Sequence, residues 1–150
     1  GNTDFTTEGI LDTTTTLGGA EAGAFDHAIT KTDPAMVMMS LATYQSIDPN
    51  NPAVFSSTII DGHIRNALKY TGVVISDSMS AEALSSYDVS QLGVKLVEAG
   101  GDMSCIGQTD YVKPIVDGLN ERAKSDPAFA SKVTAAATRV MALKIKMGLA

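Results

Sequence analysis

Three short segments rich in apolar residues, separated by stretches of helical spacing, constrain the fold of this chain more than any other feature. The segments cover residues 35–41, 73–76 and 102–106. A strand buried on both faces of a parallel sheet shows such a segment, whereas a half-exposed strand alternates apolar and polar residues. The helical stretches supply the crossovers that parallel strands need, and these crossovers are right-handed. The sequence therefore predicts an α/β fold with three parallel strands.

The helices are predicted from apolar residues at helical spacing, and the amino terminus from its composition. We expect helices over residues 21–29, 57–70, 90–99, 112–123 and 130–147. Ser56 or Ser57 caps the second of these, and Gly148 ends the last. Residues 1–19 are rich in Thr, Gly and Asp and predict an extended loop with little packing of its own.

Composition limits the classes of partner. A chain of 150 residues with a formal charge of −6 and eleven dispersed Lys and Arg argues against a nucleic-acid partner. The single cysteine, Cys105, excludes an internal disulfide and a cysteine zinc cluster, and its apolar neighbours predict a buried thiol. Neither a metal-ligand constellation nor a Gly-rich phosphate loop is found, so no metal and no cofactor is expected.

Three strands are too few to close an eight-stranded barrel, which typically takes about 250 residues. The chain is therefore either an open three-layer domain or part of a barrel. Because it starts at Gly1 rather than Met, we expect that an upstream segment has been removed. Alone, these residues are expected to leave a sheet edge and an apolar face uncovered, which favours association.

A lone carboxylate ends the second apolar run, within the sequence from Gly72 to Met79. The loops that follow the carboxyl ends of strands form the active face of an α/β sheet, which makes Asp77 a catalytic candidate. The alternative is that Ser76 and Asp77 serve as helix N-caps.

The residues around Asp77 form an ordered set of motifs. Residues 64–71 lead as a helix and a turn into Gly72-Val73-Val74-Ile75-Ser76-Asp77. Upstream stand Val37-Met38-Met39-Ser40, Tyr44 and Ile47-Asp48; downstream stand Glu98-Ala99-Gly100-Gly101-Asp102-Met103 and Arg139-Val140-Met141-Ala142-Leu143-Lys144. In this order the motifs resemble glycoside hydrolase family 3 over nearly the whole chain. They are most similar to its N-acetylhexosaminidase branch, in a secreted or lipoprotein form.

This resemblance implies a fold and a place within it. Residues 1–150 are expected to form a single partial domain, the C-terminal portion of a TIM (β/α)₈ barrel with about strands six to eight and their helices. Residues 1–19 are expected to be a loop from the active-site face. The earlier strands are expected from a missing N-terminal barrel segment.

The resemblance also implies an activity. It is that of a retaining glycosidase which releases terminal non-reducing β-linked N-acetylhexosamine from peptidoglycan or chitin-type fragments, with Asp77 as nucleophile. The expected partner is thus an oligosaccharide or amino-sugar substrate, and the expected location is secreted or in the cell envelope. Two alternatives are a β-glucosidase of the same family and a non-catalytic, sugar-binding or incomplete barrel fragment.

The acid/base residue has less support in the sequence. In the branch that this chain resembles, it is a histidine backed by an aspartate in a mobile loop, yet residues 1–8 contain no histidine. Asp4 and Glu8 are the candidates there, and the alternative is that both are solvated loop carboxylates. His27 and His63 lie in predicted helices and are expected to be packed or exposed helix residues without a catalytic role.

The resemblance places three substrate-binding candidates near the strand ends. These are Ser40, Tyr44 and Met79. Met79 either covers the apolar face of a sugar or packs within its loop. Asp48 and Asp102 are expected to be structural, because the first precedes a proline in a turn and the second begins a strand, at the stability end of a barrel.

Overall fold

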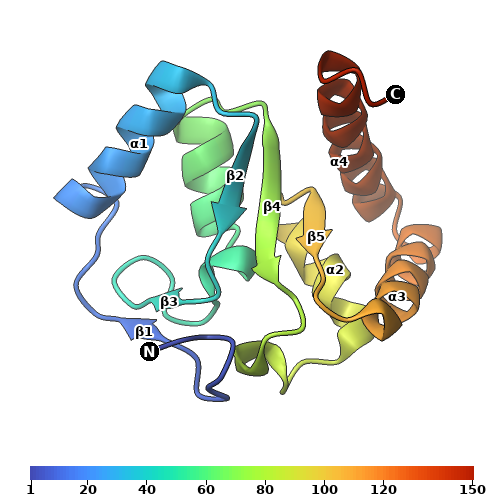
Figure 1. Cartoon of the computed structure of the whole chain (residues 1–150), viewed down its shortest axis with the longest axis horizontal. Coiled ribbons are helices and arrows are strands. Elements are labelled where there is room, and N and C mark those ends of the chain that lie inside the picture. Colours follow the sequence, from blue (N-terminus) through green and yellow to red (C-terminus); the bar gives the residue numbers. More distant parts are fainter.

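A three-stranded parallel sheet organises the computed structural model, which describes residues 1–150 (Figure 1). Its strands, in spatial order, are β2 (Met36–Met39), β4 (Val73–Ser78) and β5 (Met103–Cys105). The β2–β4 register is regular, from Met36 opposite Val73 to Met39 opposite Ser76. The predicted α/β class and the three parallel strands are confirmed.

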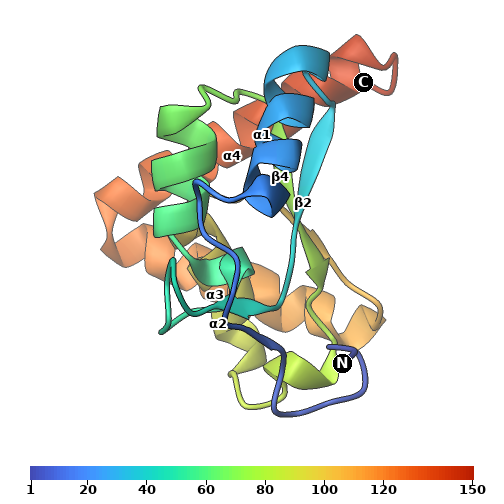
Figure 2. The same ribbon diagram turned by 90° about the vertical axis from the view of Figure 1, so that its left-hand side faces the viewer.

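The helices lie beside this sheet as a second layer. They are α1 (Ala20–Thr32), η2 (Thr58–Ala67), α2 (Val89–Ala99), α3 (Val112–Ser125) and α4 (Pro127–Lys146). Figure 2 shows α1, η2 and α2 on the same side of strands β2 and β4. This two-layer arrangement is that of a barrel wall, and it differs from a three-layer domain, whose helices cover both faces of the sheet.

The opposite face of β2 is bare, which corrects the prediction that this strand is buried on both faces. Met36 is 44% exposed and Met38 is 65% exposed, whereas Met39 is buried against the helices. Successive side chains of a strand point to opposite faces, so the two exposed methionines mark one uncovered face. The reason for the difference is tertiary: β2 lies at the edge of the sheet and no element covers its second face.

The helix over η2 is a π-helix, not the α-helix that its spacing predicted. The amide of Gly62 donates to the Ser57 carbonyl and that of Leu68 to the His63 carbonyl, each over five residues and 2.9 Å. Ile60 and Ile64 are buried as expected, because residues four apart share a face in either type of helix. The predicted cap is confirmed, since the Ser56 hydroxyl accepts the Ile59 amide at 3.2 Å.

The amino-terminal segment is more ordered than predicted. Strand β1 (Leu11–Asp12) pairs in parallel with β3 (Thr43–Tyr44), so residues 1–19 are not wholly an extended loop. Figure 1 shows this small sheet and the amino terminus on the side where the carboxyl ends of β2, β4 and β5 lie. The remaining elements are three short 3₁₀ helices, η1 (Ala53–Phe55), η3 (Glu82–Leu84) and η4 (Thr109–Tyr111).

The main core lies between the sheet and the helices. Val74 from β4, Ile60 from η2, and Leu92 and Leu96 from α2 are almost completely buried within it. Burying each such side chain contributes about 1.5–3 kcal/mol. Carboxylates cap α2 and α4: the Asp126 side chain, for example, accepts the amides of residues 128 and 129 at the start of α4. None of the helices is long and apolar enough to cross a membrane.

Asp48 has the structural role expected of it. Its carboxylate accepts the Ser56 hydroxyl at 2.7 Å and the Asn50 amide at 3.1 Å, and Asn51 donates its side-chain amide as well. Burial raises the pKa of Asp48, but these hydrogen bonds to the ionised form outweigh it and leave the pKa below its ordinary value. Asp48 therefore fixes the turn that leads from β3 to η1.

Candidate active site

Asp77 is the second-to-last residue of β4 and lies at the carboxyl end of the sheet. Val73, Val74 and Ser76 of this strand are buried, and Asp77 and Ser78 at its end are only partly buried. The Asp77 side chain is half-buried, and its Oδ1 accepts the Ser78 amide at 2.7 Å. None of the ion pairs in the structure includes Asp77. This carboxylate is thus held in place by a local hydrogen bond and is open to a ligand.

A cavity of about 540 Å³ brings Asp77 together with two other predicted site residues, Ser40 and Tyr44. Ser40 directly follows β2, and Tyr44 lies on β3, so three separate segments converge at the carboxyl end of the sheet. The size lies within the range of small-molecule sites, which have volumes of about 300–1,000 Å³. Hydroxyl and carboxylate groups beside apolar walls suit a ligand that carries several hydroxyl groups.

Asp12 lines the same cavity and was not predicted as a site residue. It ends β1, directly opposite Tyr44 of β3. Its carboxylate accepts the amides of Thr14 and Thr15, both at 2.8 Å, and these hydrogen bonds lower the pKa of Asp12. The sequence gave a weak indication of this site residue, because Asp12 follows the apolar pair Ile10-Leu11 as Asp77 follows a longer apolar run.

The acid/base candidates Asp4 and Glu8 lie outside this cavity. Both are exposed in the first loop, which η3 holds through backbone hydrogen bonds. The Ala83 amide donates to the Thr3 carbonyl at 3.0 Å, and the Glu82 amide donates to the Asp4 carbonyl at 3.4 Å. The loop is therefore tied to the segment that follows Asp77, but the structure does not bring either carboxylate to the cavity. Their role stays a prediction.

Met79 is a correction among the substrate-binding candidates. Its side chain is fully buried in the main core and has no exposed surface to offer a ligand. The physical reason is that the chain turns inward after β4, and the Met79 amide donates to the Cys105 carbonyl at 2.8 Å. Of the two alternatives, packing within the loop is the one that fits the structure.

Cys105 also differs from its prediction, since it is exposed rather than buried. It ends β5, an edge strand with no neighbour on its outer side. An apolar sequence environment predicted burial, but only a further strand or helix on this edge covers such a side chain. The Cys105 amide, by contrast, is bound by β4 through the Ser76 hydroxyl.

His63 pairs with a carboxylate between two helices. Its Nε2 lies 2.8 Å from Oδ1 of Asp26, which joins η2 to α1. Both residues line the cavity, whose lining also takes side chains from both faces of the edge strand β2. The lining includes Val37 and Met39 from one face of β2 and Met38 and Ser40 from the other. His63 is thus a helix residue whose ring nitrogen is hydrogen-bonded to Asp26, as expected.

The structure contains no group of three or more His, Cys, Asp and Glu side chains that could hold a metal ion. The titratable side chains that line the cavity are Asp12, Glu21, Asp26, His63, Tyr44 and Asp77.

The family can be identified from a comparison with family models. A model described as the glycosyl hydrolase family 3 N-terminal domain matches residues 6–143. The chain belongs to glycosyl hydrolase family 3. The resemblance inferred from the motifs around Asp77 is thereby confirmed.

Solved structures with a similar fold include two amino-sugar hydrolases. One is a β-N-acetylhexosaminidase from Beutenbergia cavernae DSM 12333, which is 36% identical, with a TM-score of 0.88 over 96% of this chain and 43% of that chain. The other is a family 3 β-N-acetylglucosaminidase from Paenibacillus sp. str. FPU-7, which is 27% identical, with a TM-score of 0.80 over 93% of this chain and 27% of that chain.

A curated relative from Arthroderma benhamiae is described as an uncharacterized secreted glycosyl hydrolase. It is 36% identical over 69 residues, which cover 45% of this chain and 20% of that protein. This chain thus spans less than half the length of each of these relatives.

Proposed function

We propose that this chain carries the nucleophile of a retaining glycoside hydrolase that releases terminal non-reducing β-linked N-acetylhexosamine. One observation carries the proposal: Asp77 emerges at the carboxyl end of β4 into a cavity that it shares with Ser40 and Tyr44. This is the end of the strand at which barrel enzymes place their catalytic groups. The names of two similar structures, a β-N-acetylhexosaminidase and a β-N-acetylglucosaminidase, support the choice of sugar.

In the proposed mechanism, an oxygen of the Asp77 carboxylate attacks the anomeric carbon while the bond to the leaving oxygen breaks. A general acid protonates that oxygen, and a covalent glycosyl-enzyme forms. The same group, now a base, takes a proton from water, which then attacks the anomeric carbon and restores the Asp77 carboxylate. Asp4 and Glu8 remain the proposed sources of this proton, through movement of the first loop toward the cavity.

We also propose that this domain is the C-terminal portion of a larger barrel, with β2, β4 and β5 as about strands six to eight. Two features support a missing N-terminal segment: the bare face of β2, with Met36 and Met38 exposed, and the cavity lined by both faces of this edge strand. A further strand would pair with the free backbone groups of the β2 edge, and further side chains would cover its exposed apolar face. The greater length of the B. cavernae enzyme agrees with this reading.

Peptidoglycan or chitin-type fragments are the proposed substrates, and a secreted or cell-envelope location suits them. The description of the Arthroderma relative as secreted supports this location. The alternatives are a β-glucosidase of the same family and a domain that binds sugar without cleaving it.

The full-length protein that contains this chain tests the proposal. We expect it to hydrolyse 4-nitrophenyl N-acetyl-β-glucosaminide at least tenfold faster, in kcat/KM, than 4-nitrophenyl β-glucoside. A fluorinated glycosyl probe that slows breakdown of the intermediate is expected to add its sugar mass to the peptide that contains Asp77. A preference for the glucoside supports the first alternative. Calorimetric binding of N-acetylglucosamine oligomers without turnover supports the second.

A further inference from the structure

Asp77 lies within an irregular part of the β4–β5 ladder. Ile75 stands opposite Met103, and Ser78 stands opposite Cys105. Three steps along β4 therefore match two steps along β5, which gives β4 one extra residue between these pairs. Such a β-bulge turns the local backbone and re-aims a side chain, and bulges are over-represented next to active sites.

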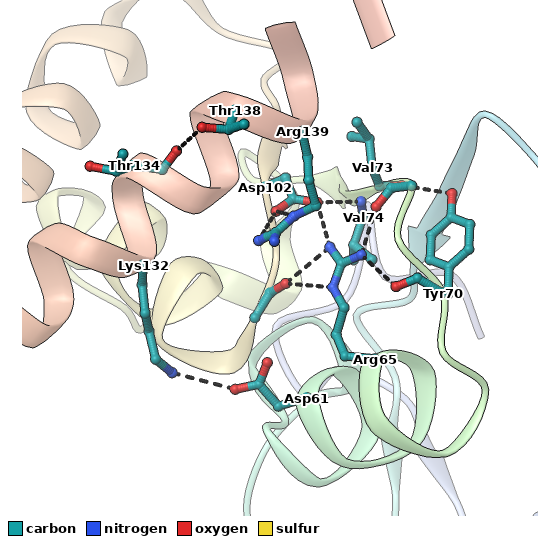
Figure 3. Close-up of polar contacts among 12 residues, drawn as sticks. Asp61, Arg65, Tyr70, Val73, Val74, Asp102, Lys132, Thr134, Thr138 and Arg139 are labelled. Atoms are coloured by element: carbon teal, nitrogen blue, oxygen red, sulfur yellow. Dashed lines mark hydrogen bonds and ion pairs between the residues drawn. The ribbon is translucent and has the colours of Figure 1, made fainter. Parts of the chain in front are cut away.

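The part of β4 before the bulge is held firmly at the amino end of the sheet. The Val74 amide donates to Oδ2 of Asp102 at 2.8 Å, and the Asp102 amide donates to the Val74 carbonyl at 2.9 Å. The Asp102 side chain is itself fully buried and is bound by Arg65 from η2 and by Arg139 from α4 (Figure 3). This anchor fixes the position of β4 along its own axis, three residues before Asp77.

Within the bulge, one side chain of β4, that of Ser76, forms a hydrogen bond to β5. The Ser76 hydroxyl accepts the Cys105 amide at 2.9 Å, and Ser76 is completely buried. After the bulge, the Met79 amide returns to the Cys105 carbonyl at 2.8 Å. The two backbone groups of Cys105 are thus bound by residues that stand immediately before and shortly after Asp77.

We propose that Ser76 is a positioning residue: its hydroxyl locks the β4 bulge and so fixes the direction in which the Asp77 carboxylate points into the cavity. This inference rests on the proposed function of Asp77. Ser76 is completely buried and stands opposite Met39, which packs against the helices, whereas Asp77 is half-buried and lines the cavity. Ser76 therefore has no access to substrate and acts only through the backbone it shares with Asp77. Positioning within a fraction of an ångström matters for the rate, since misplacing a reacting group by about 1 Å can cost 100-fold.

The experiment compares Ser76→Ala with Cys105→Ala in the full-length protein. Ser76→Ala removes the oxygen that accepts the Cys105 amide, whereas Cys105→Ala removes only an exposed thiol and leaves that amide in place. We expect Ser76→Ala to lower kcat about 10- to 100-fold with KM changed less than threefold, on the scale of loss that misplaced groups produce. Cys105→Ala is expected to keep kcat within twofold. Amide hydrogen exchange of residues 103–106 is expected to rise in Ser76→Ala alone.

A second variant separates positioning from loss of stability. Ile64→Val in η2 weakens the core away from β5, so a matched fall in Tm provides a baseline for destabilisation alone. If Ser76→Ala does not fold, Ser76→Cys takes its place, since its sulfur is a weaker acceptor at the position of the hydroxyl oxygen, and it is expected to give an intermediate kcat. An unchanged kcat in the folded Ser76 variant, with the wild type active, overturns the positioning role and leaves the proposed function intact. A wild type without glycosidase activity overturns the proposed function and this inference with it.

Discussion

A carboxylate lies at each end of the β4 strand, and the two carboxylates differ in how many hydrogen bonds and ion pairs their oxygens make. At the amino end, the Asp102 side chain is fully buried and binds two arginines and a backbone amide (Figure 3). At the carboxyl end, Asp77 is half-buried, has a single local hydrogen bond and faces a cavity. The comparison teaches that the same residue type stabilises the fold where its oxygens are fully bound and is free for chemistry where they are not. This division matches the stability and catalytic ends of barrel enzymes.

The amino end owes its strength to Arg65. This guanidinium donates to Asp102 and also to the carbonyls of Tyr70, Gly72 and Gly100, and it thereby joins the loops before β4 and β5. Its side chain is 12% exposed, whereas that of Arg139 is 29% exposed and reaches only Asp102. The two arginines are therefore unequal partners of one carboxylate.

The largest effect is expected at the carboxyl end, from Asp77→Asn. An amide cannot attack the anomeric carbon, so kcat of the full-length protein should fall about 10⁴-fold, or about 5.5 kcal/mol in the activation barrier. Tm should change by less than about 2 °C, because the Ser78 amide still finds an acceptor oxygen. Asp110→Asn, an exposed carboxylate in η4, is the matched control. Activity within tenfold of the wild type for Asp77→Asn would remove this residue from the mechanism.

The amino end should show the reverse pattern in Arg65→Met. Removing one partner of a buried ion pair costs about 3–5 kcal/mol of unfolding free energy, since Asp102 and three carbonyls lose a donor. Arg139→Met should cost less, because that side chain is more exposed and leaves Arg65 in place. Urea denaturation of the full-length variants measures both. If Arg139→Met proves the more costly change, Arg139 rather than Arg65 is the main partner of Asp102.

The bare face of β2 offers a test of the missing segment. Met38→Ser should leave the 150-residue chain within about 0.5 kcal/mol of its original stability, because this side chain is already 65% exposed. In the full-length protein, where covering strands are proposed to bury the side chain, the same change should cost about 2 kcal/mol. Thermal unfolding of the four proteins gives the comparison. Equal effects in both lengths argue that this face stays exposed.

The smallest effect concerns acid stability at Asp48. Its pKa is lowered in the folded chain, so its contribution to stability is present above the pKa of the unfolded state, near 3.9, and is lost as pH falls through the folded pKa. Ser56→Ala removes the hydroxyl that donates to Asp48, and it should lower stability by about 1–2 kcal/mol at pH 7 with a smaller difference at pH 3. Chemical denaturation at the two pH values measures this. A difference that is the same at both pH values shows that the carboxylate charge is not involved.

Local sequence patterns determined much of this protein. Short segments rich in apolar residues located the three parallel strands, although not how much of each strand is buried, and the ordered motifs around Asp77 identified the family and the candidate nucleophile. Tertiary structure alone decided the rest. It buried Met79, exposed Cys105 and Met38, and brought Asp12 beside Tyr44 through the β1–β3 pair. The physical reason is that burial and the choice of hydrogen-bond partner depend on neighbours distant in the chain, such as the residues that form the bulge between β4 and β5, which no local spacing encodes.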